Sequence, residues 1–106
     1  MRERIMRTLV FFDLPMTTAR ERKIYTKFRK ALIKDGFVMV QESIYSKLFL
    51  NLASAQAGKE RVRYYAPNKG SVKVLIITER QYASIEDFSE GRKMPVLDTT
   101  ARLVIF

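Results

Sequence analysis

Near Pro15 the sequence changes from a β-strand pattern to a helical pattern, and this change restricts the possible folds more than any other feature. Residues 8–14 form a short, apolar, β-prone run that is typical of a central strand. Pro15 ends that run. Thr18 and Glu21 have the spacing of a capping box, in which each side chain binds the backbone of the other residue. We therefore predict a strand, a short loop and a helix that begins at Thr18.

The predicted helix has one apolar side and a definite end. Its apolar stripe consists of Ile24, Phe28, Ala31 and Leu32. Asp35 and Gly36 end it, because glycine readily adopts the left-handed conformation that follows many helices.

Two further strands are expected next. Residues 37–40 and 43–50 are β-prone, and Gln41 and Glu42 mark a turn or bulge between them. One long bent strand is the alternative.

A second helix follows these strands. Asn51 is placed to cap it, and the helix reaches about Tyr65. Gly58 weakens the helical pattern, because glycine is unfavourable inside helices. The residues expected to face inward are Leu52, Ala55 and Val62.

The order of elements predicts the fold. Residues 67–70 form a turn and residues 72–78 a buried strand, which completes a βαββαβ series. This is the α+β, ferredoxin-like sandwich, in a single domain spanning residues 1–106. Such a sheet carries helices on one face only, so its other face needs a cover, often a second copy. We therefore expect a homodimer.

Residues 79–106 form a C-terminal extension beyond that fold. Residues 81–88 are expected to form a short helical turn or strand, and residues 90–100 a polar loop. The last residues form an apolar strand that pairs with the sheet edge of another subunit, although a fifth strand on the chain's own sheet is the alternative. This strand contains Leu103, Val104, Ile105 and Phe106.

The first helix carries a row of positive charge, which we call the basic ridge. It comprises Arg20, Lys23, Lys27, Lys30 and Lys34, at spacings that place all five on one side of a helix. Stacked like charges weaken a helix, and a polyanion that binds them relieves the repulsion. A solvated lysine-rich face is the alternative. The whole chain has a formal charge of +9 and a pI near 10.1, which favours nucleic acid as the partner.

The composition excludes several kinds of site. The chain contains no Cys and no His, so thiolate chemistry, serine–histidine triads and the usual zinc sites are absent. A bound metal would be an oxygen-preferring cation such as Mg²⁺ or Mn²⁺. No apolar run is long enough to span a membrane, and Asp13 and Pro15 interrupt the first one, so we expect a cytoplasmic protein without a signal peptide.

Asp13 is the candidate catalytic and metal-binding residue. It ends the first apolar strand, where a charged side chain is unusual. In a two-fold dimer, two such carboxylates could face each other across the axis and hold a divalent cation that activates water. Alternatively, the carboxylate caps the turn formed by residues 15–18.

The chain resembles the CRISPR-associated protein two family, most closely the version that accompanies type II systems. The resemblance rests on an ordered set of segments across nearly the whole chain. These segments are Phe12-Asp13-Leu14-Pro15, Arg20-Glu21-Arg22-Lys23, Gly36-Phe37, Gln41, Ser43-Ile44-Tyr45-Ser46-Lys47 and Arg102-Leu103-Val104-Ile105-Phe106.

The resemblance implies a ferredoxin-like homodimer that acts in CRISPR adaptation. In that role the dimer sits between two dimers of the integrase, CRISPR-associated protein one, and supports the central double-stranded DNA of the incoming spacer. Family members have also been described as metal-dependent nucleases acting on RNA or DNA. The family's metal aspartate matches Asp13, and its following arginine matches Arg20 or Arg22. Its Ser-Val-Tyr-like segment matches residues 43–45, with Ile44 in place of valine.

Three functions follow as hypotheses. The first is a DNA-binding adaptor that contacts phosphates through Arg22 and the basic ridge, with Ser43, Tyr45 and the last four residues at a dimer or partner interface. The second is a Mg²⁺-dependent nuclease that uses paired Asp13 residues. The third is an RNA-recognition module, for which residues 36–38 offer only a fragment of the usual aromatic motif.

Overall fold

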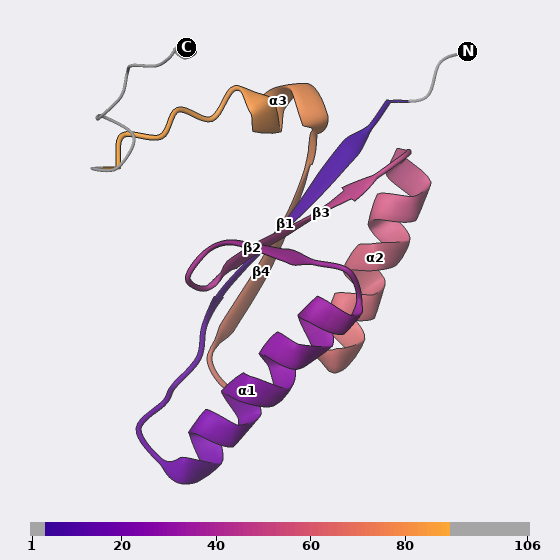
Figure 1. The fold of residues 1–106 in the computed structure, drawn as a ribbon. Coiled ribbons are helices and arrows are strands. Elements are labelled where there is room, and N and C mark those ends of the chain that lie inside the picture. The colour runs from indigo at the N-terminus through magenta and orange to yellow at the C-terminus, as the bar shows by residue number, and fades with distance from the viewer. Residues whose placement is uncertain (1–3, 90–106) are drawn as a thin grey trace.

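The computed structural model describes residues 4–89, which form a four-stranded antiparallel sheet and three helices (Figure 1). The strand order is β2-β3-β1-β4, and α1 and α2 pack on the same face. This arrangement confirms the predicted α+β, ferredoxin-like fold. The elements are β1 (Met6–Asp13), α1 (Ala19–Lys34), β2 (Val38–Gln41), β3 (Ile44–Phe49), α2 (Leu52–Tyr65), β4 (Ser71–Thr78) and α3 (Glu79–Ala83).

The two ends of α1 form as the sequence predicts. The Thr18 hydroxyl accepts a hydrogen bond from the Glu21 backbone N–H at 3.1 Å, and the Glu21 carboxylate accepts one from the Thr18 N–H at 3.0 Å. At the other end, Gly36 has a φ of +102°, a conformation that favours glycine. The capping box and the terminal glycine therefore fix where α1 begins and ends.

An aromatic cluster under the helices forms the centre of the core. The Phe12 ring lies 5.1 Å from that of Phe28 and 5.7 Å from that of Tyr45, measured between ring centroids. Leu32 and Val62 bring α1 and α2 onto the same cluster. Tyr25 also packs against Phe12, with 5.9 Å between the ring centroids, so it contributes to the core.

The second helix agrees with the prediction except at its first residue. The Asn51 side chain accepts a hydrogen bond from the Ser54 N–H, and Ala55 and Val62 are buried. Leu52, however, is 49% exposed. It precedes the first buried position of α2 and lies at the end of the sheet, so the prediction that it faces inward is wrong.

Residues 37–50 form two strands, as predicted, and not one bent strand. Gln41 is the last residue of β2, at a shift in its register with β3, and the turn consists of Glu42 and Ser43, with Ser43 at φ +69°. The expected buried strand is β4, but it lies at the edge of the sheet and Leu75 is 48% exposed. An edge strand has one neighbour only, which explains its partial burial.

The region after β4 begins with the short helix α3. For residues 81–88 the sequence predicted either a helical turn or a strand, and the structure has the helical turn at the start of that range. The expected loop at residues 90–100 and the expected strand at residues 103–106 lie outside the described residues. Among the helices of residues 4–89, none has the length and apolar character needed to cross a membrane.

Gly58 has a packing role that the sequence pattern concealed. It is buried in α2, and a Cβ at this position would lie 2.4 Å from Cζ of Phe49. Phe49 is itself buried with Met6 and Ala55, so its ring has little room to move. The glycine therefore allows α2 to approach the sheet closely.

We predict that Gly58→Ala lowers the free energy of unfolding by about 1–2 kcal/mol, because overpacking outweighs the gain in helix propensity. Urea denaturation measures the change. Phe49→Leu, alone and combined with Gly58→Ala, completes a double-mutant cycle in which the alanine becomes less costly. A Gly58→Ala variant that is more stable than wild type would show that Phe49 does not limit this contact.

Candidate nucleic-acid interface and carboxylate site

The basic ridge lies on the solvent-facing side of α1. All five of its side chains are exposed, whereas Phe28 and Leu32 face the core. Within residues 4–89, none of the five forms an ion pair. The ridge is therefore an uncompensated row of positive charge, which can bind phosphates.

Four other cations of residues 4–89 are held by acidic side chains, namely Arg7, Lys47, Arg61 and Arg63. Arg7 donates two hydrogen bonds to Glu79, at 2.8 and 2.7 Å, and stacks over the Tyr82 ring. Arg63 pairs with Glu60 on the surface of α2 at 2.9 Å. These cations support the fold, and they differ from the ridge in this respect.

Asp35 is the centre of a third cluster. Its carboxylate, 11% exposed, accepts hydrogen bonds from Arg61 Nε at 3.0 Å and from the Tyr65 hydroxyl at 3.0 Å. Lys47 Nζ lies 3.3 Å from the same carboxylate and also donates to the Asp35 backbone carbonyl. Burial and the bond to Asp35 raise the pKa of Tyr65 well above its ordinary value. The cluster ties the end of α1 to β3 and α2.

The sequence predicted only half of this cluster. It identified Asp35 as the end of the helix but did not indicate that three side chains from later elements converge on it. The only available signal was an acidic residue at a helix C-terminus, where the helix dipole disfavours negative charge unless cations compensate.

Arg22 was predicted to contact nucleic acid, but the structure gives its guanidinium other partners. It donates to the backbone carbonyls of Met16 and Thr17, at 3.2 and 2.8 Å. Its neighbour Glu21 accepts from the N–H groups of Thr17 and Thr18. Two consecutive residues of α1 therefore hold the loop that precedes the helix.

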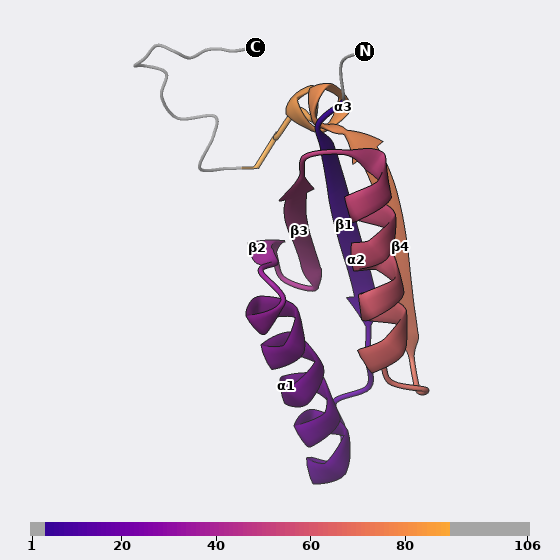
Figure 2. The same cartoon turned by 90° about the vertical axis from the view of Figure 1, so that its right-hand side faces the viewer.

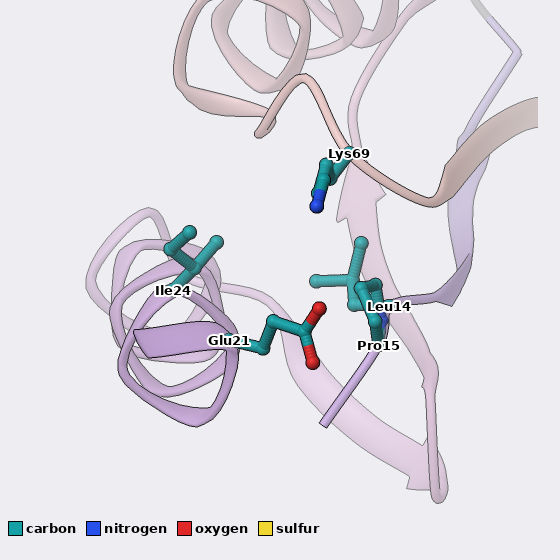
Figure 3. Close-up of a pocket in the computed structure, with 5 residues that line it drawn as sticks. All are labelled: Leu14, Pro15, Glu21, Ile24 and Lys69. Atoms are coloured by element: carbon teal, nitrogen blue, oxygen red, sulfur yellow. The ribbon is translucent and has the colours of Figure 1, made fainter. Parts of the chain in front are cut away.

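Glu21 also borders a narrow apolar pocket between this loop, α1 and the turn before β4 (Figure 3). The Lys69 ammonium and the Glu21 carboxylate point towards each other across it. The hydrogen bond from the Thr18 N–H is the largest cause that lowers the pKa of Glu21, and the charge of Lys69 adds to it. Glu21 therefore stays ionised at neutral pH.

Asp13 is the last residue of β1, opposite Ser71 of β4, and its side chain is exposed. Within residues 4–89 its carboxylate forms no hydrogen bond or ion pair, since Glu21 caps the loop in its place. Gly70 packs so closely that a Cβ there would lie 2.6 Å from the Asp13 carbonyl oxygen. The backbone of Asp13 is thus fixed while its carboxylate remains available.

One chain does not supply a complete metal site in its described part. Nowhere in residues 4–89 do three or more acidic, His or Cys side chains cluster around a common point. The free carboxylate of Asp13 fits Mg²⁺ or Mn²⁺ chemically, but only as half of a site that a second copy would complete.

The sheet face opposite α1 and α2 is largely apolar, and we call it the helix-free face. Residues paired across neighbouring strands share a face, so Leu9 of β1 lies beside Ser46 and Leu75. Arg7 and α3 close one end of this face. Its apolar residues are Leu9, Phe11, Val38, Ile44, Leu48, Leu75 and Ile77.

The structure corrects one predicted interface residue. Tyr45 is 1% exposed, packs against Phe12 and accepts a hydrogen bond from Arg29, so its ring is part of the core. Alternation along β3 places Ile44 on the helix-free face instead. Ser43 is partly exposed in the β2–β3 turn, and residues 103–106 lie outside the described residues.

The structure also weakens the RNA-recognition hypothesis. That function needs exposed aromatic side chains that stack on bases. The candidate aromatic, Phe37, is only 2% exposed and belongs to the core cluster.

Fold and site together define a small, basic, ferredoxin-like protein. Within residues 4–89 its basic ridge forms no ion pair, and a single carboxylate, Asp13, lies exposed at the end of a strand. The family model described as CRISPR associated protein Cas2 matches residues 6–85. The chain therefore belongs to the Cas2 family.

Proteins named CRISPR-associated endoribonuclease Cas2 are similar over most of the chain. The Treponema denticola protein is 46% identical, over 94% of this chain and 99% of its own length. The Ligilactobacillus salivarius protein is 42% identical over 94% of this chain and 98% of its own length. A Streptococcus mutans protein is 41% identical over 93% of this chain and 91% of its own length.

We predict that the ion pair of Glu79 with Arg7 makes stability depend on pH. The hydrogen bonds from Arg7 lower the pKa of Glu79 in the folded protein. The contribution is therefore fully present above the pKa of the unfolded chain and is lost as pH falls through the lower pKa of the folded protein. At pH 7, Glu79→Gln should lower the free energy of unfolding by about 1 kcal/mol or less.

Chemical denaturation of wild type and Glu79→Gln from about pH 3 to 7, the range in which carboxyl groups titrate, tests this prediction. The difference between the two proteins should shrink as the solution becomes acidic. Glu86→Gln, at an exposed acid without an ion pair in the described region, serves as the control. A difference that stays constant across the range would contradict the prediction.

Proposed function

We propose that this protein is the dimeric adaptor of CRISPR adaptation, which binds double-stranded spacer-precursor DNA and bridges integrase dimers. The observation that carries the proposal is the basic ridge, whose five cations are exposed and unpaired in the described structure. Membership of the Cas2 family supports a role in a CRISPR system. The row of cations along one helix suits phosphate contacts that do not depend on base sequence.

Dimerisation through the helix-free face is part of this proposal. Three apolar side chains of this face are exposed, namely Leu48 at 44%, Leu75 at 48% and Val38 at 67%. In a monomer this apolar surface would be in contact with water, which is unfavourable. A second copy packed on this face would bury them. Because α1 lies on the opposite side of the sheet, both ridges would remain free to hold one DNA duplex.

We predict that each ridge cation in contact with phosphate contributes about 0.9 to the slope of log affinity against log salt concentration. Lys27→Ala should therefore weaken binding to a fluorescein-labelled DNA duplex and reduce the slope by about that amount. Fluorescence anisotropy titrations at several salt concentrations measure both quantities.

Arg63→Ala is the matched control, because it removes the same charge from a helix surface where Glu60 already compensates it. The control should leave the slope close to that of wild type. Equal effects of the two substitutions would mean that net charge, and not the ridge, determines binding.

A metal-dependent nuclease is the second candidate. The observation in its favour is that the Asp13 carboxylate is exposed and has no structural partner within residues 4–89. The relatives' name, endoribonuclease, agrees with this possibility. Two Asp13 side chains in a dimer would hold Mg²⁺, which lowers the pKa of bound water and stabilises charge on a phosphodiester.

Asp13→Ala separates the two candidates. If the protein is an adaptor, spacer integration by the cognate integrase should require it, and Asp13→Ala should support integration as well as wild type does. If the protein is a nuclease, Mg²⁺-dependent cleavage of single-stranded RNA by the purified protein should fall to background in Asp13→Ala. Cleavage should persist in Glu42→Ala, which removes another exposed acid. If Asp13→Ala abolishes integration while DNA binding persists, the carboxylate belongs to the adaptor's own mechanism.

A further inference from the structure

The first half of α1 is held to the rest of the molecule differently from the second half. The buried residues of the helix, Phe28 and Leu32, both lie in its second half. In the first half, Ile24 and Tyr25 are only partly buried. Both views of the fold show this end of α1 projecting beyond the strands (Figures 1 and 2).

The projecting half carries the start of the basic ridge, Arg20 and Lys23. Its orientation relative to the sheet depends on the loop between β1 and α1. That loop is held from both sides. The N–H groups of Thr17 and Thr18 donate to the Glu21 carboxylate, and the carbonyls of Met16 and Thr17 accept from the Arg22 guanidinium. All four hydrogen bonds lie between 2.8 and 3.2 Å.

The charges of Glu21 and Arg22 alone would suggest roles in polyanion binding that differ from the roles their hydrogen bonds indicate. Glu21 is a carboxylate within one turn of Arg20 and Lys23, so by charge alone it should repel a polyanion. Arg22 adds positive charge to the same turn, but its guanidinium donates to two backbone carbonyls.

We propose that Glu21 and Arg22 are positioning residues for the basic ridge. They hold the projecting half of α1 at a fixed orientation, so that its cations meet phosphates without first losing conformational freedom. Glu21 therefore strengthens binding of a polyanion, although it is negatively charged, and Arg22 does so without contacting phosphate. This inference rests on the proposed function, because it concerns the DNA bound by the ridge.

The test compares Glu21→Ala, Glu21→Gln and Arg22→Ala with wild type in anisotropy titrations of a labelled DNA duplex at several salt concentrations. Glu21→Ala removes a negative charge and also breaks the loop contacts. Glutamine retains an oxygen that serves in a capping box, so Glu21→Gln removes the charge alone. Far-UV circular dichroism confirms that each variant is folded, which the core contacts of Phe28 and Leu32 support.

We expect Glu21→Ala to weaken binding roughly threefold to tenfold, the equivalent of losing one helix cap, with an unchanged salt slope. Glu21→Gln should bind at least as tightly as wild type. Arg22→Ala should weaken binding without changing the slope, whereas loss of a phosphate contact would reduce the slope by about 0.9.

Hydrogen exchange of the free proteins gives a readout that does not depend on DNA. Exchange at the start of α1 should be faster in Glu21→Ala and Arg22→Ala than in wild type, and close to wild type in Glu21→Gln.

Tighter binding by Glu21→Ala would overturn the role of Glu21, and a reduced slope for Arg22→Ala would overturn that of Arg22. Unchanged exchange in the two alanine variants would show that the contacts do not hold the helix. If wild type does not bind DNA at all, the proposed function fails and this inference with it, an outcome distinct from the others.

Discussion

Packing of both long helices against one face of the sheet is the constraint on which the rest of this molecule depends. Alternation along β1 sends Val10 and Phe12 towards α1 and α2, where the Phe12 ring lies at the centre of the aromatic cluster. The same alternation leaves Leu9 and Phe11 on the opposite face. The buried core and the apolar surface proposed for dimerisation are therefore two consequences of a single strand pattern.

The cations of the basic ridge and those paired with carboxylates have different roles. Arg7, Lys47, Arg61 and Arg63 are each paired with a carboxylate, and they join elements that are distant in sequence or, for Arg63, one turn apart. The basic ridge has no such partners within the described residues. A high net charge alone could not separate these groups, because only the folded structure shows which acids each cation reaches. This division supports the ridge as the nucleic-acid interface.

Features set by neighbouring residues could be predicted from the sequence. The capping box of Thr18 and Glu21, the terminal Gly36 and the Asn51 cap all act within one helical turn, and all three were confirmed. Features set by distant contacts could not be predicted. Tyr45 is buried because α1 and Phe12 cover it, and Gly58 is required because Phe49 approaches it from β3. For Asp13 the sequence left a metal ligand and a cap of the following turn open as alternatives. Within residues 4–89 the loop is bound by Glu21, and the Asp13 carboxylate forms no hydrogen bond or ion pair.

The central claim is that a dimer formed through the helix-free face presents two basic ridges to one DNA duplex. Native mass spectrometry of the protein with a short duplex tests it most directly. Wild type should give two chains on one duplex, and Leu75→Arg on the helix-free face should abolish the dimer. Leu52→Arg, at a residue of α2 that is 49% exposed against 48% for Leu75, should leave the dimer intact. One wild-type chain per duplex, or a dimer that survives Leu75→Arg, would contradict the account.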